Sequence, residues 1–328
     1  MVGRFSIVTE FAVLLESGGT PDRIMKKDKL YANFLAGFFF CLVGAVCFST
    51  KAIMVKLAYR ETQIDAVTLL ALRMLFSLPF FIISAAVASS KRTNVKFTGK
   101  QWFAVAIIGM LGYYVSSYLD FVGLQYISAG MERLILFIYP TIVLLISAVV
   151  FKEKIKRIQW IALLITYAGL LLAFWGEVDF NQQQHEGFYH GAFLIFLCAI
   201  TYATYIAGSG RLIPIVGSTK FNSYAMSFAC AGVLLHYYIV SDQSLFNLST
   251  EVYVYSILMA IVATVIPSYM VSEGIKRIGS DNAAIIGSVG PVSTIIQAYI
   301  FLHEPIFALQ LAGTALILVG VLMIGKKK

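Results

Sequence analysis

Charged residues are scarce in this sequence. Asp, Glu, Lys and Arg make up 13% of its 328 residues, whereas 59% are hydrophobic and the mean hydropathy is +0.82. Soluble domains carry about 25% charged and about 45–50% apolar residues. A globule in water cannot bury so large an apolar share. The composition therefore excludes a soluble fold and indicates an integral membrane protein.

Cysteine is also scarce, with four residues in the whole chain. All four lie inside apolar runs, where thiols behave as small buried hydrophobic groups, so we expect neither a disulfide framework nor a metal site. The four histidines lack metal-ligand spacing, and the sequence has no phosphate-binding loop, nucleophile elbow or HExxH motif. These absences predict a protein that is not an enzyme, needs no cofactor and does not hydrolyse ATP itself.

The net charge of +8 does not indicate a nucleic-acid partner, because the basic residues lie in short loops between apolar segments. Of the 25 Lys and Arg residues, 20 fall in the N-terminal tail, the C-terminus and alternate loops. By the positive-inside rule, both termini are expected to be cytoplasmic. Residues 1–30 carry no signal peptide and are predicted to form a disordered cytoplasmic tail.

Long apolar runs occupy the rest of the chain. A bilayer core of about 30 Å needs about 17–25 mainly apolar residues per helix. Runs such as 142–151 leave no polar lumen face, which excludes an outer-membrane barrel. We predict an all-α integral membrane fold of ten transmembrane helices, near 34–57, 66–88, 101–120, 128–151, 158–176, 188–207, 222–240, 252–272, 281–302 and 308–325.

The chain repeats itself with an offset of 151 residues. The superimposed pairs include Gly123 with Gly274, Pro140 with Pro291 and Gly169 with Gly320. We therefore predict a first repeat at 34–176 and a second repeat at 188–325, each with five helices. Because five is odd, the second repeat must be inverted in the membrane, which is a transporter architecture with the binding site between the repeats.

The repeated residues also resemble a known family. In the first repeat, the segment from Gly123 to Gly130, the pair Tyr139-Pro140 and the segment from Gln159 to Gly169 resemble the fourth and fifth helices of the EamA-type family, in the drug/metabolite transporter superfamily. In the second repeat, Gly274 to Ala284, Gly290-Pro291 and Gln310 to Gly320 resemble the same pattern. The resemblance implies a ten-helix carrier of small metabolites or amino acids, often an exporter, in the bacterial inner membrane.

Five ionisable side chains lie inside helices of the first repeat: Lys51, Arg73, Asp120, Glu132 and Arg133. Each costs about 2.5–3.5 kcal/mol on insertion scales and needs a partner, water or a function. From their distance to the helix ends, at about 1.5 Å per residue, we expect all five in one layer near the outer face. If this layer lines the transport pathway, its net charge of +1 favours a carboxylate substrate. The alternative is a set of paired structural ions, or side chains that snorkel to the interface.

Prolines and tyrosines provide further candidates. Pro140 and Pro291 occupy equivalent places and are expected to kink their helices, either as hinges or as static packing devices. Tyrosine suits a pocket with apolar walls and hydroxyl tips, although aromatic side chains also serve in packing and in interfacial belts. The candidate pathway tyrosines are Tyr114, Tyr118, Tyr205 and Tyr269, together with Tyr113 and Tyr202.

These features predict a secondary transporter of a small metabolite that works by alternating access. The first expectation is an exporter of amino acids or related compounds. One alternative is an exchanger of organic anions, nucleotide sugars or organic phosphates, whose binding requires several cationic side chains. The other is a non-transporting membrane sensor or scaffold. The expected partners are a small-molecule substrate, the lipid bilayer and a coupling ion such as a proton, but no nucleic acid.

Overall fold

The computed structural model describes residues 21–90, 96–181, 187–303 and 305–325, and every regular element in these ranges is a helix. In the first repeat the elements are α2 (Pro21–Glu61), α3 (Ala66–Ser90), α4 (Gly99–Gly109), η1 (Met110–Val115), α5 (Ser116–Gly123), α6 (Ala129–Leu136), α7 (Tyr139–Val149) and α8 (Arg157–Asn181). In the second repeat they are α9 (Phe188–Val216), α10 (Ser218–Val240), α11 (Thr250–Ala260), η2 (Ile261–Val265), α12 (Ile266–Ile278), α13 (Ser280–Ile286), α14 (Val289–Gln297), η3 (Ala298–Leu302) and α15 (Ala308–Gly325).

Eight segments of the described chain are long and apolar enough to cross a membrane. Two further apolar helices, at Arg157–Leu172 and Ala308–Met323, are shorter. Large apolar side chains such as Phe103 and Val149 are exposed on the outside, as expected for a surface that faces lipid rather than water. The protein is therefore a multi-pass membrane protein, and the ranges given above are all-helical.

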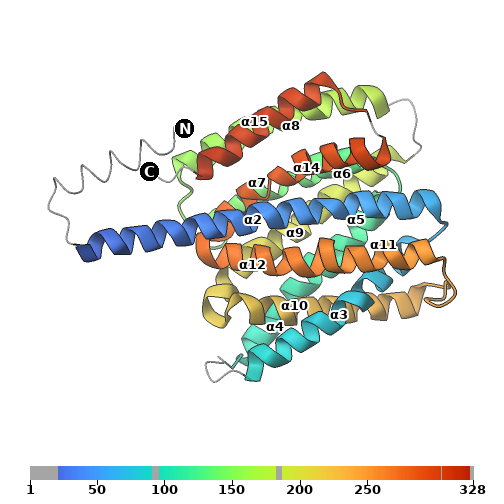
Figure 1. The fold of residues 1–328 in the computed structure, drawn as a ribbon, viewed down its shortest axis with the longest axis horizontal. Coiled ribbons are helices and arrows are strands. Elements are labelled where there is room, and N and C mark those ends of the chain that lie inside the picture. The colour runs from blue at the N-terminus through green and yellow to red at the C-terminus, as the bar shows by residue number, and fades with distance from the viewer. Residues whose placement is uncertain (1–20, 91–95, 182–186, 304, 326–328) are drawn as a thin grey trace.

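The N-terminal helix is longer than the sequence predicts. α2 begins at Pro21, inside the segment 1–30 that was expected to be a disordered tail. Residues 1–20 of that tail lie outside the described residues. The membrane-crossing part of α2, Tyr31–Glu61, follows this N-terminal extension. Figure 1 shows α2 running along the middle of the bundle beside α12.

The offset of 151 residues recurs in the helix boundaries. α4 begins at Gly99 and α11 at Thr250, and each continues into a π-helical turn, which begins at Met110 and at Ile261. Each π-helix is followed directly by another α-helix, α5 in the first repeat and α12 in the second. The two repeats therefore share local backbone geometry that their few identical residues do not suggest.

Both helices that contain a repeated proline are broken just before it. The α-helical hydrogen-bond pattern is interrupted by a tighter turn between Leu136 and Tyr139, ahead of Pro140, and again between Ile286 and Val289, ahead of Pro291. Proline favours a break here because it has no N–H to donate and its ring crowds the preceding turn. As a result, α6 and α7 share one crossing of the bundle, and α13 and α14 share another.

Helices of the two repeats interleave. α2 packs against α12 and α14, α3 packs against α10 and α11, and α9 packs against α5, α6 and α7. Neither repeat forms a separate bundle, so the inner surfaces of the two repeats meet along the middle of the molecule. This arrangement places a site between the repeats within reach of residues from both.

α8 and α15 form a pair along one side of the molecule, visible at the top of Figure 1. Small residues allow the two helices to approach closely. A Cβ atom built on Gly169 would lie 2.5 Å from the carbonyl oxygen of Gly313, and one built on Gly320 would lie 2.8 Å from that of Ala162. The repeated glycines Gly169 and Gly320 thus face the partner helix from both sides of this contact.

We expect Gly169→Ala and Gly320→Ala each to lower the free energy of unfolding by about 1–3 kcal/mol, because the added methyl group overpacks the α8–α15 contact. Unfolding of purified protein in detergent measures this. Gly99→Ala is the matched control, because a Cβ there meets nothing within 4 Å. If all three variants were equally stable, α8 and α15 would be able to move apart and accommodate the added methyl group without loss of stability.

Candidate functional site

An internal cavity of about 80 Å³ lies between the two repeats. Its walls come from α2, α3, η1, α5, α6 and α7 of the first repeat and from α9, α12, α13 and α14 of the second. This space is large enough for several water molecules, since one water needs about 10–15 Å³ of such volume. Polar side chains that line it can therefore be hydrated within the membrane.

Four of the five predicted charged residues meet in one cluster, the ion cluster, formed by Lys51, Asp120, Glu132 and Arg133. Lys51 Nζ lies 2.6 Å from Asp120 Oδ2 and 3.8 Å from Glu132 Oε1. Arg133 Nε lies 3.1 Å from Glu132 Oε2. The two carboxylates are fully buried, and two cations lie beside them, so the formal charges of the cluster sum to zero when both carboxylates are ionised.

Three helices hold the ion cluster together. Lys51 comes from α2, Asp120 from α5, and Glu132 and Arg133 from the start of α6. α6 begins at Ala129, where Ser128 accepts a hydrogen bond from the backbone N–H of Met131. Arg133 also donates from Nη2 to the carbonyl oxygen of Phe48, 2.9 Å away on α2. The cluster thus joins α2, α5 and α6 at one level of the bundle.

Arg73 forms no ion pair with the ion cluster, although its side chain also lines the cavity. None of the ion pairs among the described residues includes it. Its Nε donates to Thr264 Oγ1 at 2.7 Å, and its guanidinium carbon lies 5.4 Å from the centre of the Phe121 ring. Its Nη1 is buried without a hydrogen-bond partner in the described structure. Arg73 therefore has no direct ion-pair partner in the described structure, although the negative charge of Asp120 acts on its guanidinium from farther away.

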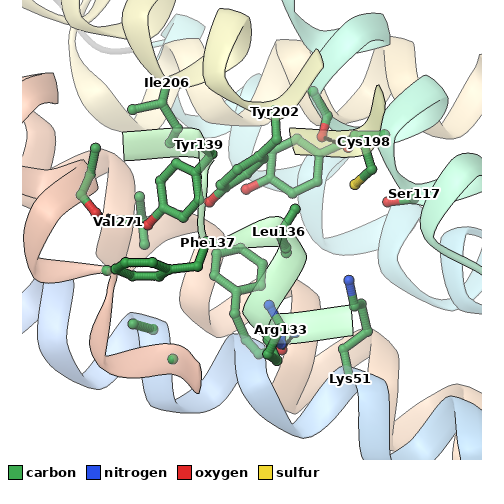
Figure 2. A pocket seen from close by; sticks show the side chains of 18 of the residues that line it. Lys51, Ser117, Arg133, Leu136, Phe137, Tyr139, Cys198, Tyr202, Ile206 and Val271 are labelled. Atoms are coloured by element: carbon green, nitrogen blue, oxygen red, sulfur yellow. Dashed lines mark hydrogen bonds between the residues drawn. The ribbon is translucent and has the colours of Figure 1, made fainter. Parts of the chain in front are cut away.

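Tyrosines form the wall that faces the cationic side of the cavity. Figure 2 shows Lys51 and Arg133 on one side and Tyr139 and Tyr202 on the other. The rings of Tyr139 and Tyr202 meet edge to face at 5.1 Å between centroids. Tyr113 lines the cavity as well. The site thus combines positive charge with a flat, largely apolar wall, as binding sites for small organic molecules often do.

The tyrosines predicted from the sequence divide between the cavity and other environments. Tyr205 packs beside the cavity, 4.9 Å from the Tyr113 ring, but is not among its lining residues. Tyr114 and Tyr118 contact the ring of His236 on α10. Tyr269 shares a hydrogen bond of 2.9 Å with Ser223. In this conformation, these four side chains lie outside the cavity wall.

Sequence reasoning missed Tyr139, which joins the two helix breaks. The Ser288 N–H bonds to the Ile285 carbonyl, as in a tighter 3₁₀ turn, at 3.1 Å. The Ala284 carbonyl accepts instead from the Tyr139 hydroxyl at 2.9 Å. The one signal for this role was its position directly before Pro140. Pro291 itself lines the cavity, so both breaks lie at the site.

Comparison with known proteins finds related sequences and a related fold. A model of the EamA-like transporter family matches residues 35–175 and 190–326. The uncharacterized transporter YcbK of Bacillus subtilis is 33% identical over 286 residues, covering 85% of this chain and 89% of the relative. The uncharacterized transporter YyaM of the same organism is 23% identical, covering 71% and 75%. A solved crystal structure matches with a TM-score of 0.67 at 16% identity, over 89% of this chain and 96% of that chain, which shows the fold alone.

We expect Lys51→Met to lower the free energy of unfolding by about 3 kcal/mol, because it leaves two buried carboxylates with too little positive charge. The double variant Lys51→Met/Asp120→Asn restores neutrality and is expected to recover more than half of this loss. Unfolding in detergent measures both, with the exposed cation Arg60, changed to Gln, as the control. Unchanged stability of Lys51→Met would contradict a structural role for the ion cluster.

Proposed function

The chain belongs to the EamA-like transporter family, and from this premise we propose that it is a secondary transporter of a small metabolite with a carboxylate group, in the first place an exporter of amino acids or related compounds. The observation that carries this proposal is Arg73, a buried guanidinium that lines the cavity between the repeats without a carboxylate partner in the described structure.

The charge balance of the cavity supports a substrate with one negative charge. Lys51 and Arg133 line the cavity, but Asp120 and Glu132 already neutralise them. Only Arg73 remains to attract an anion, and a guanidinium is well suited to a carboxylate because it can donate two parallel hydrogen bonds. An organic phosphate or a nucleotide sugar carries more negative charge than one arginine neutralises. We therefore rank these exchangers below a carboxylate carrier.

For the architecture, we propose ten membrane crossings, with α8 and α15 added to the eight long spans. Each repeat then has five crossings, and the second is inverted relative to the first. The distribution of Lys and Arg supports cytoplasmic termini in a bacterial inner membrane. In this orientation, α2 ends and α6 begins on the outer side, and the ion cluster lies in the outer half of the bundle.

Alternating access requires that contacts between the repeats break at one end of the bundle at a time. At the proposed cytoplasmic end, Ser147 donates to Asp281 at 2.7 Å, and Arg211 pairs with Glu153 at 2.6 Å. At the opposite end, the Tyr255 hydroxyl donates to Glu61 at 2.7 Å. Polar contacts that can exchange for water thus join the repeats at both ends, which supports rocking around the central cavity.

The energy source we propose is a gradient, either of the substrate itself or of a coupling ion such as a proton. Asp120 and Glu132 are the candidate proton carriers, because they are buried carboxylates beside the cavity. Protonation of either would leave the ion cluster with a charge of +1 and would weaken its hold on Lys51. Such a change links proton binding to the contacts among α2, α5 and α6.

Counterflow into proteoliposomes tests the proposed substrate class. The panel contains neutral L-amino acids, monocarboxylates, hexoses and organic phosphates, with the carboxamide of each amino acid as the matched compound that lacks the carboxylate. We expect the acids, and not their amides, to exchange. Arg73→Gln is expected to lower this exchange at least about tenfold, because it removes a charge-assisted hydrogen bond of about 1.5–3 kcal/mol.

Arg60→Gln serves as the control for loss of an arginine outside the cavity. Size-exclusion profiles of each purified variant separate a folding defect from a transport defect. Competition by the amides as strong as by the acids, or a preference for the organic phosphates, would overturn the proposed substrate class.

A further inference from the structure

Two of the three π-helical turns in the described structure, η1 and η2, contribute equivalent residues to the surroundings of the cavity and of Arg73. Residue 113 in η1 corresponds to residue 264 in η2 by the 151-residue offset. Tyr113 lines the cavity that Arg73 also lines, and Thr264 accepts a hydrogen bond from Arg73. π-helical turns inside α-helices are rare, and those that do occur are often found at functional sites. Because η1 and η2 lie at matching places in the two repeats, the residues that they position are candidates for a functional role.

η2 sets the direction of the Thr264 hydroxyl. This hydroxyl donates its one hydrogen to the carbonyl oxygen of Met259, five residues earlier and 2.8 Å away. Its oxygen is then left to accept, and it does so from Arg73 Nε at 2.7 Å. The carbonyl thus prevents the hydroxyl from turning its hydrogen toward the guanidinium. Thr264 is fully buried, so water does not replace this contact in the described conformation.

The contact leaves one nitrogen of the guanidinium, Nη1, without a hydrogen-bond partner, although Nη1 is buried in the described conformation. Nε is held by Thr264, the face of the group lies over Phe121, and Nη1 has no partner among the described residues. A group that is anchored by one donor and keeps another free is prepared to bind an anion with little loss of side-chain entropy. Neither the ion cluster nor the tyrosine wall contributes to this anchoring.

We infer that Thr264 is a positioning residue of the substrate site, which holds Arg73 so that Nη1 can donate to the carboxylate of the transported compound. The inference rests on the proposed carboxylate substrate. Thr264 acts through Arg73 and does not contact the substrate. Because Arg73 belongs to the first repeat and Thr264 to the second, each repeat supplies one part of the carboxylate site.

A packing role for Thr264 makes a different prediction. Valine has nearly the shape of threonine and would fill the same space in η2, but it cannot accept from Arg73. If the side chain only packs, Thr264→Val transports as well as wild type. If it positions Arg73, the valine variant loses affinity for carboxylates, whereas Thr264→Ser keeps the hydroxyl and restores it.

The experiment compares Thr264→Val, Thr264→Ser and wild type in counterflow of the labelled neutral L-amino acids, each against its carboxamide. We expect Thr264→Val to raise KM about tenfold, with a smaller change in maximal rate, and to reduce the preference for acid over amide. Thr264→Ser is expected to stay within about twofold of wild type. Thr314→Val on α15 is the matched control, because the Thr314 hydroxyl is buried without a hydrogen bond in the described structure.

The outcomes separate this inference from the proposed function. A wild type that does not prefer acids to amides overturns the carboxylate substrate and the role of Thr264 with it. A wild type that prefers acids, with Arg73→Gln defective and Thr264→Val normal, overturns the role of Thr264 alone. If Thr264→Val fails to fold, Thr264→Cys replaces it, because a thiol is a weak acceptor of similar size, and normal KM in that variant overturns the inference as well.

Discussion

A charged side chain inside the hydrocarbon layer is costly unless it finds a counter-charge, a polar partner or water. The first repeat carries five such side chains, and the packing of its helices follows from how their charges are balanced. Asp120 and Glu132 are fully buried, so α5 and α6 can take their places in the bundle only where Lys51 and Arg133 reach these carboxylates. This requirement brings α2 to the same level. After this pairing Arg73 has no ion-pair partner in the described structure, and the proposed carboxylate substrate would supply one.

The two repeats have matching backbones but contribute different side chains to the cavity. Both contain a π-helical turn and a break before proline, at places related by the 151-residue offset. The first repeat has Tyr139 before its proline, and the second has Gly290 at that position. The tyrosine crosses to the Ala284 carbonyl in the other repeat, whereas the glycine has no side chain, and a Cβ there would lie 3.9 Å from the carbonyl oxygen of Ala45. The shared backbone therefore supports an asymmetric site, with charge and aromatic rings mainly from one repeat and acceptors from the other.

The sequence predicted much of the fold and part of the site. Apolar runs, basic loops and the repeated prolines indicate the helices and their breaks, because these signals are local, and the expected family is confirmed. The direction in which a side chain points within an apolar helix depends on packing. That Arg73 forms none of the ion pairs among the described residues, and that Tyr114 and Tyr118 contact α10, was therefore not predictable. Thr264 was missed because π-helical turns lack a sequence pattern.

The connections around the cavity indicate how a change in shape could alter binding. The ion cluster joins α2, α5 and α6 within the first repeat, so these helices can move together without separating their charges. Arg73 is held differently, since α3 carries the guanidinium and η2 of the second repeat supplies its acceptor. Any motion that separates α3 from η2 must break this hydrogen bond and release the guanidinium. α3 packs closely on α10 and α11, which favours motion of α3 with the second repeat. In that case Arg73 stays anchored, and the ion cluster moves relative to it.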